Sequence, residues 1–207
     1  MKYLKMLGLA VVAAAALMAF VGAGTAMAEK GVVCSVTTSP CTSKWPAGTE
    51  LDWSLVANTS AKLVDTKGNV LDTCTKSTVQ GELTENPNAT GTATGINKKI
   101  DWEGCTVTTD TIKAGGLKIQ GITGTDNGTL IADATIEVTV NVFSSCNYGV
   151  EAGTSLGTIT GGIAPIFTAN AVAKKLNGGF LCPETTRWTA EYQLTKPTGT
   201  ALYIVGS

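Results

Sequence analysis

Cysteine is the residue type with the clearest chemical meaning in this chain. An even number of cysteines in an exported protein indicates disulfides, but spacing does not fix the pairing, because six cysteines allow 15 connectivities. A structural zinc site would need clustered thiolates such as C-x-x-C, and the sequence has no such spacing. We expect sequence neighbours to pair, which gives Cys34–Cys41, Cys74–Cys105 and Cys146–Cys182.

Histidine is absent from the chain, which removes several kinds of catalytic site. Ser-His-Asp and Cys-His catalysis cannot be assembled without an imidazole. A glycosidase could still use two carboxylates that face each other across a cleft. The available acids are Asp52, Asp101, Glu103, Asp110, Glu184 and Glu191, and no short motif singles out a pair. We therefore predict a non-enzymatic protein with no catalytic, cofactor-binding or metal-ligating residue.

The four tryptophans are the other candidates for ligand contact, because an exposed indole can stack on a sugar ring. Trp53 and Trp188 fall on the apolar phase of alternating segments, which favours a place in the core. Trp45 precedes Pro46 in an expected loop. Trp45 is therefore the tryptophan that we expect to be exposed and in contact with a ligand.

The first 28 residues have the pattern of a secretory signal peptide. Lys2 and Lys5 supply the basic start, residues 7–20 are almost wholly apolar, and Ala26-Met27-Ala28 offers the small residues of a cleavage site. Cleavage between Ala28 and Glu29 leaves residues 29–207, which we expect to form one domain without stable membrane insertion. The alternative is an uncleaved anchor, since the apolar stretch approaches the length of a membrane span.

Alternation of apolar and polar residues dominates the remaining chain and predicts strands. Over residues 129–143 the even-numbered positions are apolar from Leu130 to Val142 and the odd-numbered ones are mostly polar, which is typical of a half-buried strand. Asp126-Asn127-Gly128 before it is a hairpin-turn signal. Further expected strands cover residues 32–37, 51–55, 61–65, 70–83, 92–102, 105–109, 117–122, 157–163, 167–173, 188–194 and 201–205.

Many short strands without a convincing helical segment indicate an all-β fold. The 24 glycines and the abundant Thr and Val fit short strands joined by tight turns. We predict a single antiparallel β-sandwich or barrel-like domain that is stapled by disulfides and follows an N-terminal signal helix.

The net charge and the distribution of Lys and Arg do not favour a nucleic-acid partner. The formal net charge of the whole chain is −1, and it becomes −3 when Lys2 and Lys5 leave with the signal peptide. Phosphate binding needs concentrated Lys and Arg, and no segment of the chain gathers them. The expected partner is instead an extracellular ligand or a component of the cell envelope.

Several segments resemble a group of exported actinobacterial Thr/Gly-rich proteins of unknown function. The resemblance rests on Gly178-Gly179-Phe180-Leu181-Cys182-Pro183, on residues 186–192 and 201–204, and on Cys34, Cys41, Pro46-Ala47-Gly48-Thr49, Cys74 and Cys105. It implies bacterial export and a shared β fold, and it implies no activity.

The sequence thus predicts a secreted or cell-envelope β protein that serves as a binding or structural module. Two alternatives stay open. The first is a secreted carbohydrate-active protein with Trp platforms and paired carboxylates. The second is an envelope barrel or pore, although the low aromatic content of 6% is unfavourable for the aromatic girdles of such a protein.

Overall fold

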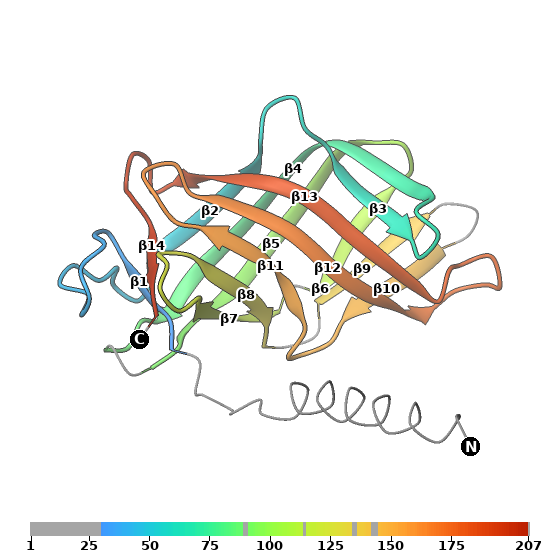
Figure 1. Ribbon diagram of the computed structural model, residues 1–207. Coiled ribbons are helices and arrows are strands. Elements are labelled where there is room, and N and C mark those ends of the chain that lie inside the picture. Colours follow the sequence, from blue (N-terminus) through green and yellow to red (C-terminus); the bar gives the residue numbers. More distant parts are fainter. Residues whose placement is uncertain (1–29, 89–90, 114, 134–135, 142–144, 207) are drawn as a thin grey trace, which may run out of the picture.

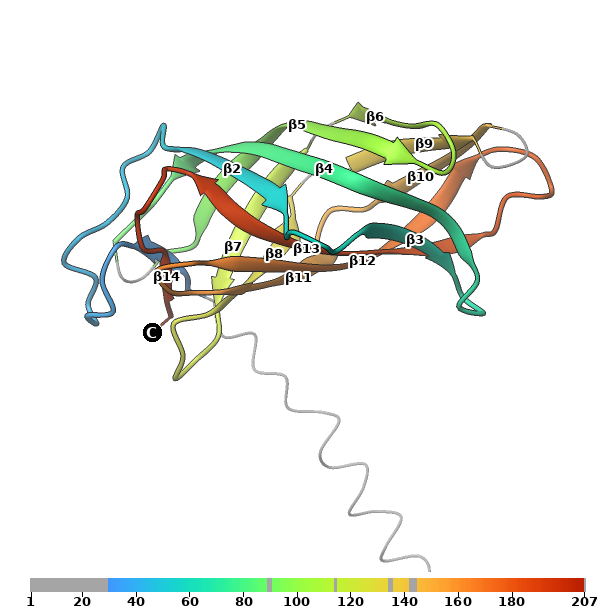
Figure 2. The ribbon, with the colours of Figure 1, turned by 90° about the horizontal axis from the view of Figure 1, so that it is seen from above.

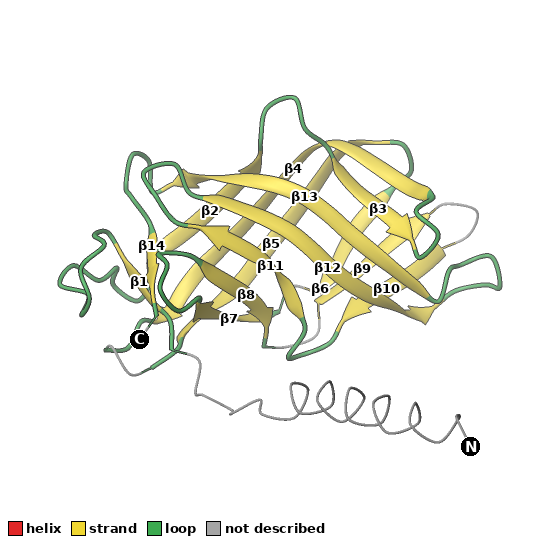
Figure 3. Cartoon of the chain, viewed as in Figure 1, coloured by secondary structure: helices red, strands yellow, loops and turns green. Residues whose placement is uncertain are grey.

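The computed structural model describes residues 30–206 except 89–90, 114, 134–135 and 142–144. Within these residues the chain consists of strands and connecting loops, without a helix, and the predicted all-β class is confirmed (Figure 3). The signal peptide and the cleavage position between Ala28 and Glu29 lie outside the described residues. No helix in the described part is long and apolar enough to cross a membrane.

Fourteen strands follow one another in the described part of the chain (Figure 1). Their bounds are β1 Val32–Cys34, β2 Glu50–Leu55, β3 Ala61–Asp65, β4 Val70–Glu85, β5 Ala93–Cys105, β6 Thr109–Lys113, β7 Gly116–Gly121, β8 Gly128–Ala132, β9 Ile136–Asn141, β10 Ser145–Val150, β11 Ser155–Thr160, β12 Ile166–Asn177, β13 Thr185–Lys196 and β14 Tyr203–Val205.

Twelve of the strands form one antiparallel sheet that closes on itself. A first ring runs through β2, β4, β5, β7, β8, β11, β12 and β13 and returns to β2 by hydrogen-bonded pairs throughout. A second ring runs through β3, β4, β5, β6, β9, β10, β12 and β13, and among the described residues its neighbours are hydrogen-bonded except for β5 and β6. The predicted antiparallel, barrel-like architecture is thus confirmed in a form with two rings end to end.

The long strands β4, β5, β12 and β13 belong to both rings, so the rings share walls. Figure 2 shows β2, β4 and β5 on one side of the interior and β11 and β12 on the other. β2 in the first ring and β3 in the second ring both lie between β4 and β13.

Within residues 129–143, where a single long strand was predicted, the described residues belong to two strands, β8 and β9. β8 pairs with β7 and β11 in the first ring, whereas β9 pairs with β10 and β6 in the second. Ala132 of β8 and Val140 of β9 are both buried, so even-numbered positions face the interior in both strands. Periodicity alone therefore could not reveal that the chain passes from one ring to the other here.

Two further strand predictions need correction. Residues 106–108, predicted within a strand, form the connection between β5 and β6, and β10 was not predicted at all. The Asp126-Asn127-Gly128 turn lies where expected, between β7 and β8, and the side-chain oxygen of Asn127 accepts a hydrogen bond from the Gly161 backbone N–H at 3.0 Å.

An aromatic cluster crosses the interior where the rings meet. Trp53, Phe167, Tyr192, Trp188 and Trp102 contact one another with ring centroids 5.6–6.4 Å apart, mostly edge to face. An apolar cavity of about 40 Å³ lies on its first-ring side and another of about 50 Å³ on its second-ring side. The predicted burial of Trp53 is confirmed, and Trp188 is half-buried against the core.

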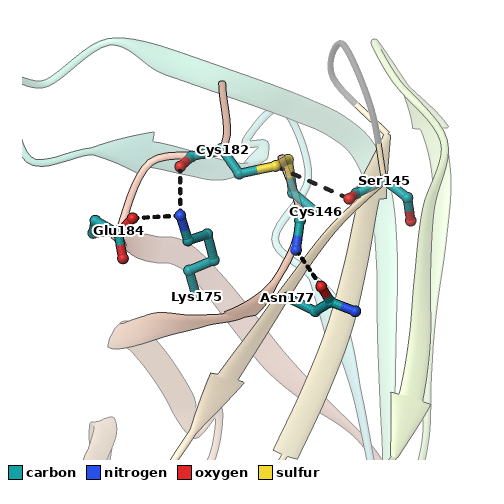
Figure 4. Close-up of polar contacts among 7 residues, drawn as sticks. Ser145, Cys146, Lys175, Asn177, Cys182 and Glu184 are labelled. Atoms are coloured by element: carbon teal, nitrogen blue, oxygen red, sulfur yellow. Dashed lines mark hydrogen bonds and ion pairs between the residues drawn. A yellow bond between two sulfur atoms is a disulfide. The ribbon is translucent and has the colours of Figure 1, made fainter. Parts of the chain in front are cut away.

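The disulfides are Cys34–Cys41, Cys74–Cys105 and Cys146–Cys182, the neighbour pairs that the sequence favoured. Cys74–Cys105 joins paired positions of β4 and β5. Cys34–Cys41 lies by the β1–β14 pair at one end of the molecule. Cys146–Cys182 ties β10 to the β12–β13 loop, where Lys175 also bonds Glu184 and the Cys182 carbonyl (Figure 4). Three disulfides indicate an oxidising environment for the folded chain.

Candidate functional site

An open groove lies on the outer wall between the end of β2 and the start of β3. β2 pairs with β4 up to Ser54 opposite Thr78, and β3 resumes at Ala61 opposite Cys74. Between these points residues 56–60 leave the wall, so residues 75–77 of β4 lack a neighbouring strand on that side. The resulting groove has a volume of about 340 Å³. We call it the β2–β3 groove; its lining is Ser54, Leu55, Val56, Ala57, Asn58, Thr75, Lys76, Ser77, Thr78, Asp101 and Glu103.

The rim of the groove is a hydrogen-bonded turn. The Thr59 backbone N–H and hydroxyl both donate to the Val56 carbonyl, at 3.1 and 2.7 Å. The Val56 N–H donates to the Glu191 carbonyl of β13 at 2.8 Å. Asn58 has a φ of 64°, a left-handed conformation that Asn tolerates better than most residues. The turn therefore fixes the backbone of Asn58 on the rim, where the residue is exposed.

The wall of the groove is a cross-strand row of polar side chains. Register places Ser54 of β2 opposite Thr78 of β4, and Thr78 opposite Asp101 of β5. Lys76 and Glu103 form the next outward pair, with their charged atoms 3.7 Å apart. Asp101 is in turn 2.8 Å from the Lys99 ammonium. Each carboxylate thus has a lysine beside it, and the wall is polar without a strong net charge.

The buried residue Ser77 lies at the floor of the groove and is hydrogen-bonded to Tyr192 beneath it. Tyr192 of β13 reaches across the interior and donates a hydrogen bond of 3.0 Å to Ser77 Oγ, and both residues are buried. Burial raises the pKa of Tyr192 well above its usual range, so the phenol stays protonated at neutral pH. The floor is consequently neutral and closed toward the aromatic cluster.

These groups suit hydrogen bonding to a polyhydroxylated ligand. Hydroxyl, amide and carboxylate groups converge from three strands and a turn, while Leu55, Val56 and Ala57 offer an apolar side. Asp101 and Glu103 lie two residues apart on one strand, so they stand side by side on one wall. Glycoside hydrolysis needs carboxylates on either side of the scissile bond, a requirement that this placement does not meet.

Trp45, expected to be an exposed ligand contact, is instead buried, with 4% of its surface exposed. Its backbone N–H donates to the Val33 carbonyl, and its carbonyl accepts a hydrogen bond from the Asn86 amide at 2.8 Å. These bonds fold the loop before β2 back onto the end of the first ring, where the indole joins the core. The sequence around Trp45, a loop position next to Pro46, does not indicate this long-range hydrogen bond to Asn86.

The other predicted acids do not gather at one place. Asp110 lines a separate recess beside the β5–β6 connection, and Glu184 bonds Lys175 at the β12–β13 loop. Asp52 and Glu191 are not part of the groove lining. Of the predicted carboxylates, the structure brings Asp101 and Glu103 together.

Sequence reasoning missed Asn58, Ser77 and Thr78 as site residues. Polar residues in a Thr-rich chain carry no local signal, and these three meet because β2 and β3 share one place in the wall.

Potential metal ligands come together at one place in the described chain. Asp72, Cys74 and Cys105 lie close together, but both sulfurs are joined in a disulfide. The Asp72 carboxylate already accepts hydrogen bonds from the Thr106 and Thr109 hydroxyls at 2.7 and 2.6 Å. This group is therefore a structural link between β4 and the start of β6.

Comparison with protein-family models, with curated proteins and with solved structures finds no match to this chain. The function is therefore inferred from the geometry of the groove.

Proposed function

We propose that this chain is an exported, non-enzymatic binding protein that holds an uncharged carbohydrate in the β2–β3 groove. One observation carries the proposal: the interruption of the wall between β2 and β3 creates a groove of about 340 Å³ in which polar groups from separate elements converge. This volume lies in the range of ligand pockets, roughly 300–1,000 Å³.

The chemistry of the lining favours a neutral sugar. Ser54, Thr78 and Asp101 lie in one row on the wall, where the two hydroxyls can donate or accept hydrogen bonds and the carboxylate can accept them. Sugar hydroxyls can make the matching hydrogen bonds, because they both donate and accept. The apolar side at Leu55 and Val56 fits the C–H face of a sugar ring. The lysines beside Asp101 and Glu103 balance their charge, so an ionic ligand gains little from this site.

Export is part of the same proposal. The N-terminal pattern of residues 1–28 and the resemblance to exported actinobacterial proteins support secretion or residence in the cell envelope. Disulfides and a largely uncharged surface suit a binding module that works outside the cytoplasm.

The test is a titration of residues 29–207 with a panel of neutral oligosaccharides, monitored by amide NMR. We expect saturable shifts confined to residues 54–58, 75–78 and 101–103 for at least one sugar. Asp101→Asn replaces one acceptor oxygen by a donor, and Thr78→Val removes a hydroxyl, so each should weaken that sugar about 3- to 10-fold.

Glu151→Gln is the matched control, because Glu151 is another exposed carboxylate, 3.1 Å from a lysine ammonium, and lies outside the groove. It should leave sugar affinity unchanged. Shifts spread over the surface, or equal effects of Thr78→Val and Glu151→Gln, would contradict the proposal.

A further inference from the structure

The chain has two Asn-Gly pairs, Asn127-Gly128 and Asn177-Gly178. An asparagine that precedes glycine can lose its side-chain amide without an enzyme, because the glycine nitrogen carries no neighbouring side chain and can attack the side-chain carbonyl carbon. The reaction needs that nitrogen to be free of the sheet and close to the carbonyl carbon. The structure places the two pairs in different surroundings.

Asn177 and Gly178 are exposed at the end of β12 (Figure 4). The Gly178 backbone N–H donates to Asn177 Oδ1 at 2.8 Å, so its nitrogen also lies close to Cγ, the carbon bonded to that oxygen. A Cβ on Gly178 would lie 2.6 Å from Cys182 Sγ, so a larger residue does not fit here without a shift. The fold therefore holds an unhindered nitrogen beside the carbon that it can attack.

Asn127 and Gly128 are held within the first ring. Gly128 is buried and begins β8, where it pairs with Gly121 of β7 and with Ile159 of β11. Asn127 Oδ1 accepts a hydrogen bond from the Gly161 backbone N–H at 3.0 Å, which directs the side chain toward the β11–β12 connection. Attack at Asn127 therefore requires the start of β8 to open first.

The loop that begins beside the exposed pair is fixed at both ends. Residues 178–184 connect β12 to β13 and are tied to β10 by the Cys146–Cys182 disulfide. Phe180 and Leu181 lie in the turn of this loop, with 94% and 54% of their surfaces exposed. A change of charge or of backbone length at the end of β12 therefore acts at the base of an exposed loop.

We propose that Asn177 is a site of spontaneous deamidation in the folded protein. The Gly178 nitrogen gives its proton to solvent and bonds to Asn177 Cγ, while the bond from Cγ to the side-chain nitrogen breaks and the amide leaves as ammonia. Water then opens the resulting succinimide at either carbonyl, which leaves aspartate or isoaspartate at this position. The net reaction consumes water, releases ammonia and adds a negative charge. This site is separate from the β2–β3 groove and does not depend on the carbohydrate proposal.

The test follows residues 29–207, with the disulfides intact, during incubation in neutral and in mildly alkaline buffer without denaturant. Mass spectrometry of proteolytic fragments measures the converted fraction at each Asn-Gly pair. We expect conversion at Asn177 to be at least about 10-fold faster than at Asn127, because Gly128 must first leave the sheet. Conversion should accelerate as the pH rises, because the Gly178 nitrogen attacks after it has lost its proton.

The unfolded chain provides the matched comparison. In urea with the disulfides reduced, the sheet is lost and both pairs keep the same Asn-Gly chemistry, so their rates should become similar. Asn177→Gln lengthens the side chain by a methylene, which removes the favourable ring closure. This variant should abolish conversion at its own position and leave conversion of Asn127 unchanged.

The proposal would be overturned if Asn177 stayed unconverted in the folded protein over a period in which the unfolded chain converts it. Equal rates at the two pairs in the folded protein would also overturn it, because the fold would then make no difference. The comparison of the two pairs in the wild-type protein gives the answer whether or not the variant folds.

Discussion

Asp72 shows how one buried charge can organise two strands. Its carboxylate is 3% exposed and accepts hydrogen bonds from the Thr73 and Val107 backbone N–H groups and from two threonine hydroxyls. These donors come from β4, from the β5–β6 connection and from the start of β6. The residue therefore fixes the β5–β6 connection next to the Cys74–Cys105 disulfide.

Removing this carboxylate should cost much of the protein's stability. Asp72→Ala removes the acceptor of four part-buried hydrogen bonds, each worth about 0.5–1.5 kcal/mol, so we expect a loss of about 3 kcal/mol or more. Urea unfolding followed by tryptophan fluorescence measures it. Glu151→Gln, an exposed substitution, should stay within about 0.5 kcal/mol. A loss below about 1 kcal/mol for Asp72→Ala would show that the network is not a structural link.

At the scale of elements, the pairing of β11 with β12 and β8 depends on one glycine. Gly157 has a φ of 146°, and a Cβ there would lie 2.1 Å from the Thr168 carbonyl oxygen. It adjoins the register shift between Ser155 and Gly157 where β11 pairs with β8. The backbone of β12 approaches so closely that no side chain fits.

Gly157→Ala should therefore destabilise the first ring strongly. Strain and overpacking each cost about 1–3 kcal/mol, and together we expect about 3 kcal/mol or more. Gly153→Ala is the matched control, because Gly153 also has a positive φ of 84° but open space around a Cβ. It should cost about 1 kcal/mol from strain alone. Similar unfolding midpoints for the two variants would contradict the role of close β11–β12 contact.

At the scale of the whole molecule, the shared strands make the two rings one cooperative unit. β4, β5, β12 and β13 each contribute residues to both rings, and the aromatic cluster packs between the two cavities. Opening one ring would expose half of each shared strand and one side of this cluster.

Native-state hydrogen exchange should reveal this coupling. We expect the slowest amides in β4, β12 and β13, with the same opening free energy on both sides of the aromatic cluster. The β1–β14 pair is a separate two-stranded sheet and should open at lower free energy. Different opening free energies for the first-ring and second-ring halves of β12 would show that the rings unfold independently.

The sequence by itself determined the class of fold and most of its strands. Alternation such as Trp188, Ala190, Tyr192 and Leu194 depends on which face of a strand is buried, and that information is local. The disulfide pairs also followed sequence proximity. The absence of histidine restricts the chemistry open to the chain whatever its fold, because no arrangement of strands can supply a missing imidazole.

Tertiary structure alone decided the arrangement in two rings and the location of the β2–β3 groove. β8 and β9 continue one alternating pattern in different rings, and Trp45 is buried through a hydrogen bond to the distant Asn86. The groove depends on where β2 ends and β3 begins beside β4. Such features depend on contacts between residues far apart in the chain, and the local periodicity of the sequence does not encode them.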